Sequence, residues 1–180
     1  MPELTEEDIK NMSPEQISEL QKQNCVFCHI ISGKIPSYKV YEDEHCIAIL
    51  DINPASKGHM LLIPKEHYLI LPQVPENTLK HLAKVAKLLS LTAIKGLGAE
   101  GTNIFIANGA VAGQRAPHFI IHIIPRKEND SINCFELPER EIRKEDIDNI
   151  QKALANRFGV KVEEKELEEI DLKQLKTMLE

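Results

Sequence analysis

The sequence predicts an α+β fold, because short aliphatic strand patterns lie on both sides of one long amphipathic helix pattern. Three strands are expected before the helix, at residues 39–42, 46–50 and 59–64. Two more strands, at 103–107 and 118–124, follow the helix. The chain has 180 residues, which is enough for one domain with additions at its ends.

The helix signals are strongest at 75–96, where apolar residues recur every three or four positions. Gly96 and Gly98 are suited to end this helix. Another helix is expected at 14–23, because Ser13 can cap its first turn and Gln16 can complete a capping box. The apolar stripe of the long helix comprises Leu79, Leu82, Ala83, Ala86, Leu89 and Ala93.

The composition of the chain changes after Arg126, and the remaining residues are interpreted as an extension without chemistry of its own. This extension should hold an amphipathic helix at 144–158, ended by Gly159, and a short helix at 171–179. The predicted regions are residues 1–24, an N-terminal helical arm; 25–127, the main domain; and 128–180, the C-terminal extension.

Charge and hydropathy argue against several classes of protein. The net charge is −6, whereas a general nucleic-acid binder carries a basic surface. No run of 18 apolar residues occurs, so no membrane span is expected. The acidic, polar N-terminus resembles neither a signal peptide nor a transit peptide. A cytoplasmic protein with reduced cysteines is therefore expected.

Cys25 and Cys28 are separated by two residues, a spacing that lets two thiolates grip one tetrahedral ion. His67, after the third strand, and His118, at the start of the fifth, are candidates to complete a Cys2His2 zinc site. A reduced pair without metal, or a redox pair, is the alternative. The other residues of these types receive no chemical role: Cys46 is expected to be buried in a strand, Cys134 lies in a loop, and His29, His45 and His81 are interpreted as surface or packing residues.

The strand expected at 118–124 places alternate side chains on opposite faces. His118, Ile120 and His122 share one face, while Phe119, Ile121 and Ile123 should enter the core. Two residues four apart on a strand are separated by roughly 13 Å, so the two histidines cannot bind one metal ion. The preceding loop is rich in glycine and alanine, and its backbone N–H groups could approach a phosphate. A buried strand with two hydrogen-bonded histidines is the alternative interpretation.

Three stretches of the chain together resemble the histidine-triad (HIT) family, and the resemblance covers about residues 25–126. They are CVFCHIISGKIPSYKVYEDEHCIAILDINPASKGHMLLIPKEHY, ANGAVAGQ and PHFIIHIIPR, and the Cys-x-x-Cys pair resembles the zinc-bearing bacterial and archaeal branch. The resemblance implies an antiparallel meander sheet with one long helix. It also implies a homodimer in which the sheet continues across two chains.

The family's signature strand reads His-x-His-x-His, and here its first and third histidines match His118 and His122. Ile120 occupies the middle position. In the family the middle histidine attacks the α-phosphate and forms a nucleotidyl-histidine intermediate, a role that suits imidazole. Isoleucine has no lone pair, so the resemblance implies a nucleotide site in which the covalent chemistry is impaired.

Further roles are implied residue by residue. The zinc ligands would be Cys25, Cys28, His67 and His118. Asp51 would bind the ribose hydroxyls, unless it only caps a turn with Asn53, and His59 would support the active strand. Val26, Phe27, Ile30, Ile49 and Ile52 would form an apolar slot for the base, with Asn53 beside it. Asn108, Gly113, Gln114 and His122 would face the phosphate, and Arg115 could add a phosphate contact.

Three hypotheses of function follow. The first is a protein that binds a purine nucleotide such as AMP or GMP and has lost the covalent mechanism. The second is a working hydrolase or transferase of nucleoside phosphoramidates or dinucleoside polyphosphates. In it a water or another residue replaces the nucleophile, His122 and His59 are the nearby candidates, and Gln114 is a further catalytic candidate. The third is a zinc-stabilised module for protein interaction.

Overall fold

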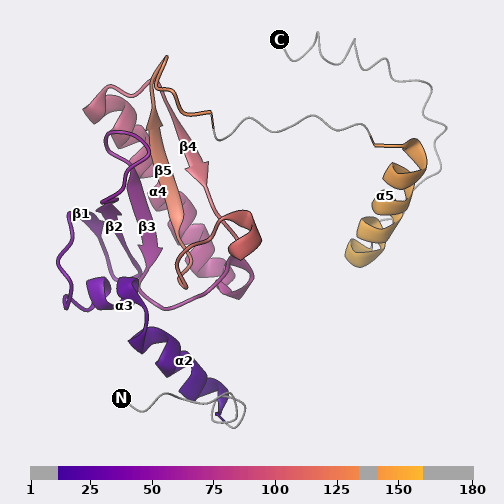
Figure 1. Cartoon of the computed structure of the whole chain (residues 1–180), viewed down its shortest axis with the longest axis horizontal. Coiled ribbons are helices and arrows are strands. Elements are labelled where there is room, and N and C mark those ends of the chain that lie inside the picture. Colours follow the sequence, from indigo (N-terminus) through magenta and orange to yellow (C-terminus); the bar gives the residue numbers. More distant parts are fainter. Residues whose placement is uncertain (1–11, 134–141, 160–180) are drawn as a thin grey trace. The chain divides into compact units, whose positions relative to one another are not determined.

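The computed structural model of the chain describes residues 12–133 and 142–159. The chain divides into two compact units, Met1–Asn133 and Cys134–Glu180. Figure 1 shows the sheet and its helices in the first unit, and α5 (Lys144–Phe158) in the second. The helix expected at 144–158 is confirmed, and Gly159 ends it in the left-handed conformation. The helix expected at 171–179 and Cys134 lie outside the described residues.

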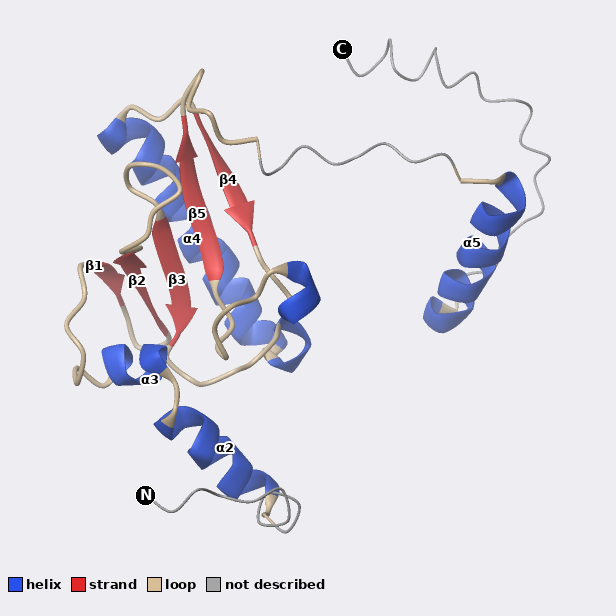
Figure 2. Cartoon of the chain, viewed as in Figure 1, coloured by secondary structure: helices blue, strands red, loops and turns tan. Residues whose placement is uncertain are grey.

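A five-stranded antiparallel sheet forms the centre of the first unit, with strand order β1-β2-β3-β5-β4. The predicted α+β class is therefore confirmed (Figure 2). The sheet ends at β1 on one edge and at β4 on the other. The strands are β1 (Lys39–Glu42), β2 (Cys46–Leu50), β3 (Met60–Pro64), β4 (Gly101–Phe105) and β5 (Ile121–Arg126).

The last two strands differ from the predicted ranges. β4 begins at Gly101, two residues before the expected start, and Gly101 pairs with Arg126. β5 begins only at Ile121, because the residues before it bond elsewhere: the Phe119 N–H donates to the Tyr68 carbonyl. Pro117 has no N–H to donate to a ladder, which is a further reason for the sheet to end here.

The described residues of the first unit form the α-helices α2 (Pro14–Gln23), α3 (Val26–Ile31) and α4 (Glu76–Leu97). The capping box expected at the start of α2 is present, and Gly98 ends α4 in the left-handed conformation. The prediction of the apolar stripe on α4 was wrong for one residue. Ala83 is exposed and Val85 is buried instead, because the buried face is centred on the positions around Leu82 and Leu89.

The apolar side chains form two clusters, one on each face of the sheet. The α4 face gathers the alternate residues Met60 and Leu62 of β3 and Ile121 and Ile123 of β5, together with Phe119. The opposite face gathers the intervening strand residues, and α3 packs against them. The second cluster consists of Ile47, Ile49, Leu61, Ile63 and Ile120, with Phe27, Ile30, Ile31 and Ala116 packed against it.

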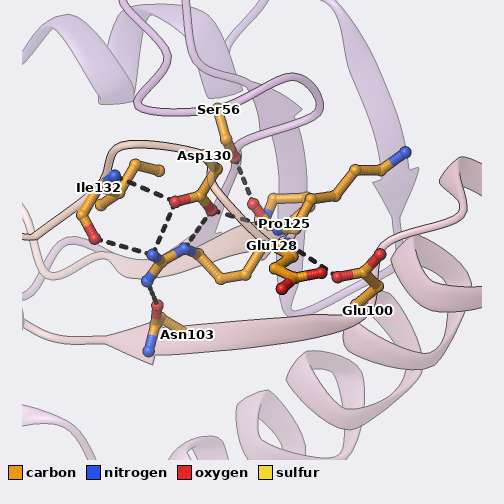
Figure 3. Close-up of polar contacts among 9 residues, drawn as sticks. Ser56, Glu100, Asn103, Pro125, Glu128, Asp130 and Ile132 are labelled. Atoms are coloured by element: carbon orange, nitrogen blue, oxygen red, sulfur yellow. Dashed lines mark hydrogen bonds and ion pairs between the residues drawn. The ribbon is translucent and has the colours of Figure 1, made fainter.

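Arg126, the last residue of β5, bonds to Asn103, Asp130 and Ile132, which Figure 3 labels. Its Nε and Nη2 atoms donate to the two oxygens of Asp130, over 2.6 and 2.8 Å, and Nη2 also donates to the Ile132 carbonyl. Nη1 donates to Asn103 on β4. The bonds from Arg126 to the Asp130 carboxylate lower the pKa of Asp130. The contacts of the first unit thus continue beyond residue 127, where the main domain was predicted to end.

No helix among the described residues is long and apolar enough to cross a membrane.

An added methyl group at Gly58 would meet both a positive φ and a neighbouring side chain. Its φ is +86°, and a Cβ atom would overlap Leu97 Cδ1 at the end of α4. Gly33 has a similar φ of +78° with open space around it. Leu97 Cδ1 is the end of an exposed, flexible side chain that can turn away, so the positive φ is the main cost at both positions. We expect Gly58→Ala and Gly33→Ala each to lower the free energy of unfolding by about 1 kcal/mol, measured by urea denaturation. A loss at Gly58 several times that at Gly33 would show that the Leu97 side chain cannot move aside.

Candidate functional site

The structure brings together the four side chains that were predicted as metal ligands. Cys25 caps α3 and Cys28 lies in its first turn, while His67 follows β3 and His118 precedes β5. Nδ1 of His118 lies 3.4 Å from Cys25 Sγ and 3.8 Å from Cys28 Sγ. Nδ1 of His67 lies 3.2 Å from Cys28 Sγ. All four donor atoms lie within 4.8 Å of one another.

These separations fit one tetrahedral ion. Zinc bonds of about 2.3 Å to sulfur and about 2.0 Å to nitrogen place the two ligand atoms roughly 3.6 Å apart at the tetrahedral angle. The observed sulfur–nitrogen distances, 3.2, 3.4 and 3.8 Å, lie on both sides of that value. Two thiols and two imidazoles are a donor set typical of structural zinc.

The surroundings favour the neutral imidazoles that a metal ion requires. Burial lowers the pKa of His118 to about 4, with His67 adding to the effect, and burial together with Lys22 lowers the pKa of His67. Nε2 of His118 lies 3.1 Å from the Pro64 carbonyl, which suits a protonated Nε2 and leaves Nδ1 as an acceptor. Nε2 of His67 is buried without a hydrogen-bond partner among the described residues. Burial and the neighbouring Cys25 raise the pKa of the Cys28 thiol to about 12, so a nearby cation is needed to favour the thiolate.

A separate polar group is formed by His59, His122 and Asp51. Nε2 of His59, just before β3, lies 3.1 Å from Nδ1 of His122 on β5. Asp51 Oδ1 accepts a hydrogen bond from the Asn53 N–H, as in the predicted turn. Asp51 Oδ2 lies 3.5 Å from His59 Nδ1. His118 and His122 therefore serve different groups, in agreement with their expected separation along the chain.

The hydrogen bonds of His59 decide which nitrogen of His122 carries its proton. The Ala55 N–H donates to His59 Nδ1 over 3.2 Å, so the proton of a neutral His59 lies on Nε2. That Nε2–H then donates to His122 Nδ1. The proton of His122 is thereby placed on Nε2, which has no hydrogen-bond partner among the described residues. His122 is presented as a neutral donor of one N–H.

Burial favours the neutral form of both rings. It lowers the pKa of His59, against the opposing effect of Asp51. It also lowers the pKa of His122, where His59 adds to the effect and Asp51 opposes it. The ring of Phe105, which pairs with His122 across β4 and β5, lies 5.8 Å from the His122 ring between centroids. The sequence did not point to Phe105 or Ala55, because strand register and a loop N–H carry no local signal.

Ile120 lies on the sheet face opposite Phe119 and Ile121, as predicted from alternation. Its side chain is 9% exposed and packs in the second apolar cluster. Three of the five residues expected to form the apolar slot, Phe27, Ile30 and Ile49, belong to the same cluster. The other two lie outside it: Val26 is exposed on α3, and Ile52 is 82% exposed in the loop after β2.

The loop before β5 uses most of its polar groups internally. The side chain of Gln114 accepts from the Gly109 N–H and donates to the carbonyls of Leu69 and Ala116. Asn108 Oδ1 accepts from the Leu71 N–H. These bonds hold the loop against the segment after β3. The remaining predicted phosphate residues, Gly113 and Arg115, and Asn53 near the expected base slot are exposed.

A polar group that the sequence did not reveal joins the β1–β2 turn to α4. Asp43 accepts hydrogen bonds from Tyr41 Oη over 2.7 Å and from the N–H groups of His45 and Cys46. His81 Nε2 lies 2.7 Å from the same carboxylate. Although burial acts to raise it, these bonds lower the pKa of Asp43. Cys46 is buried, as predicted, and His81 has a tethering role beyond ordinary packing.

Comparisons with known proteins agree with this geometry. The family model of the HIT domain matches residues 32–129. Adenylylsulfatase HINT3 of Arabidopsis thaliana is 44% identical over 115 residues, which span 64% of this chain and 58% of that protein. A zinc-bound histidine triad family protein from Mycobacterium smegmatis is 36% identical with a TM-score of 0.59, covering 77% of this chain and 98% of its own. A histidine triad nucleotide-binding protein from Candida albicans is 30% identical with a TM-score of 0.67, covering 76% and 98%.

The histidine pair should make stability depend on pH. In the unfolded chain both imidazoles have a pKa near 6.5, whereas burial lowers their pKa in the folded chain. Below about pH 6.5 the unfolded chain therefore binds more protons, and the free energy of unfolding falls as the pH falls. We expect His122→Asn to show a smaller fall than the original chain between about pH 7.5 and pH 5, in urea unfolding. Identical pH dependences in the two proteins would contradict the assignment.

Proposed function

Since the chain belongs to the HIT-domain family, we propose that it binds a purine nucleotide on the sheet face that carries His122 and Ile120. In this proposal it binds the nucleotide without covalent turnover, and a structural zinc ion supports the binding face. The names of relatives point in this direction: one is a nucleotide-binding protein and another a zinc-bound family member.

The observation that carries the proposal is the fixed donor on His122. A neutral N–H group held by a hydrogen bond on the far side of its ring can bind a phosphate oxygen without reorienting. The same proton assignment leaves His122 Nε2 without a free lone pair, so this atom can act neither as nucleophile nor as general base. The geometry thus favours anion binding over replacement of the missing nucleophile.

The neighbouring residues suit the other parts of a nucleotide. Phe27, Ile30 and Ile49 gather on the same sheet face as Ile120 and supply apolar surface for a base. Asp51 uses one oxygen for the Asn53 N–H and has the other near His59. Carboxylate oxygens retain further lone pairs, so Asp51 can accept hydrogen bonds from ribose hydroxyls.

Ile120 is the reason to propose binding without turnover. The family's covalent step needs an imidazole at the position that Ile120 matches, and an aliphatic side chain cannot form or release a phosphoramidate bond. A working hydrolase is the second candidate, favoured by the similarity to an adenylylsulfatase. It would have to transfer the nucleotidyl group directly to water, with the amine, sulfate or phosphate as the leaving group.

A zinc ion in the Cys25, Cys28, His67 and His118 cluster would join α3, the segment after β3 and the segment before β5. The ion would supply only positive charge and cross-linking here, because four protein ligands leave no open position. Phe27 and Ile30 follow Cys25 on α3, and Ile120 follows His118. The cluster therefore positions residues of the proposed base slot relative to the strand that carries His122.

We also infer a homodimer formed at the β4 edge. β4 is the last strand of the described sheet, and Ile104 is exposed on it. Leu88, Leu91 and Ile94 are exposed on α4, which packs against β4. An exposed strand edge beside apolar surface is a typical site of strand pairing between chains.

One experiment separates binding from turnover. Calorimetry should show AMP binding to the zinc-loaded chain, and His122→Ala should weaken it at least tenfold, or by about 1.4 kcal/mol. His45→Ala, in the β1–β2 turn, should bind normally. Ile120→His should hydrolyse a nucleoside phosphoramidate at least about a hundredfold faster than the original chain, because it restores the nucleophile. Ile120→Asn, polar but not nucleophilic, is the matched control.

Two results would contradict the proposal. If AMP, ADP and GMP all fail to bind the zinc-loaded chain, nucleotide binding is excluded. The result would then favour the hypothesis of a zinc-stabilised protein-interaction module. If the original chain turns over phosphoramidate as fast as Ile120→His, the protein is an enzyme.

Metal content tests the zinc proposal independently. The purified chain should contain one zinc per molecule, and Cys28→Ala should lose most of it. Cys46→Ala removes a buried cysteine outside the cluster and should retain the metal. Chelation should lower the melting temperature of the original chain by several degrees, because bound metal stabilises only the folded state. A chain that contains no zinc after growth with zinc, and that chelators leave unchanged, would contradict the assignment.

A further inference from the structure

α5 carries an apolar stripe along one side. Ile147, Ile150, Leu154 and Phe158 are 50, 51, 58 and 81% exposed. At 100° per residue these four positions fall within about 80° of the helix circumference. The helix has no buried residue. Such a narrow stripe has the width of a helix-to-helix seam.

The length of α5 indicates that the stripe is covered in solution. The helix has 15 residues. Isolated helices of about 12–15 residues are marginal in water, and most helix stability in proteins comes from packing of the apolar face. A partner that covers the stripe would therefore stabilise the helix itself.

We propose that α5 pairs in antiparallel orientation with α5 of a second copy of this chain. The charges beside the stripe carry this choice of partner. Asp146 and Arg157 are 11 residues apart, which is three helical turns plus about 20°, so both lie on the same flank of the stripe. In an antiparallel pair, a given flank of one helix lies against the same flank of the other helix, and the two flanks run in opposite directions. Asp146 then lies opposite the partner's Arg157, and the pair occurs twice by symmetry.

A parallel arrangement loses these contacts. It sets the flank that carries Asp146 and Arg157 against the other flank of the partner helix, so neither ion pair forms, and it aligns the two helix dipoles. The antiparallel register also matches the apolar residues, with Ile147 near the partner's Phe158 and Ile150 near the partner's Leu154. Arg143 donates to Asp146 over 2.9 and 3.1 Å, and this bond holds the carboxylate beside the seam.

A photo-crosslink tests the pairing and its direction in the full chain. p-Benzoylphenylalanine replaces Phe158, and unlabelled chains are mixed with ¹⁵N-labelled chains so that mass spectrometry can identify links between copies. The expected links join position 158 of one copy to the residues around Ile147 of another. Links from 158 to the region of 158, links only to the 12–133 unit, or no links between copies would overturn the proposal.

Mixed charge variants test the two ion pairs. Asp146→Arg leaves no acidic group to face the partner's Arg157, and Arg157→Asp leaves no basic group to face the partner's Asp146. Each variant alone should therefore crosslink at least fivefold less than the original. A mixture of the two should recover most of the yield, because each variant complements the other. Glu145→Arg and Asn156→Asp make similar charge changes on the opposite side of the helix and should crosslink normally. If the mixture stays as low as the single variants, or if the control variants fall equally, the antiparallel seam is wrong.

Discussion

Side-chain alternation along residues 119–123 is the constraint on which both the fold and the site depend. Phe119, Ile121 and Ile123 enter the cluster beneath α4 and anchor this segment in the core. Ile120 and His122 must then lie on the other face, where α3 and the loop after β2 approach. A shift by one residue would exchange the two sets, burying His122 in the aliphatic core and exposing Phe119. The core packing therefore determines where the polar donor is presented.

The two groups of side chains that contain histidine have different roles at this face of the sheet. The cluster of Cys25, Cys28, His67 and His118 brings together segments that lie far apart in the sequence, and a metal ion held there would cross-link them. The pair of His59 and His122 also joins distant parts of the sequence, and its hydrogen bond fixes the position of a proton. The backbone N–H of Ala55 begins this hydrogen-bond chain, so a loop without any chemistry of its own sets the tautomer of the residue proposed to meet the phosphate.

Much of the architecture could be predicted because it follows from local patterns. The capping box at Ser13, the αL end at Gly98 and the aliphatic alternation of β2 and β3 are signals within a few residues. The spacing of the residues and the family resemblance led us to expect that Cys25, Cys28, His67 and His118 lie close together. The rest depends on tertiary contacts that leave no periodic signal. Gln114 bonds to carbonyls of two different segments, Asp43 meets His81 across the fold, and β5 starts late because Phe119 bonds to Tyr68.

The proton on His122 can be observed directly by ¹⁵N NMR of the histidine rings during an AMP titration. The account predicts that His122 is neutral near pH 7 with its proton on Nε2, and that the Nε2 resonance moves on addition of AMP while Nδ1 keeps the shift of a hydrogen-bond acceptor. A proton on Nδ1 of His122, or ring resonances unchanged at saturating AMP, would contradict it.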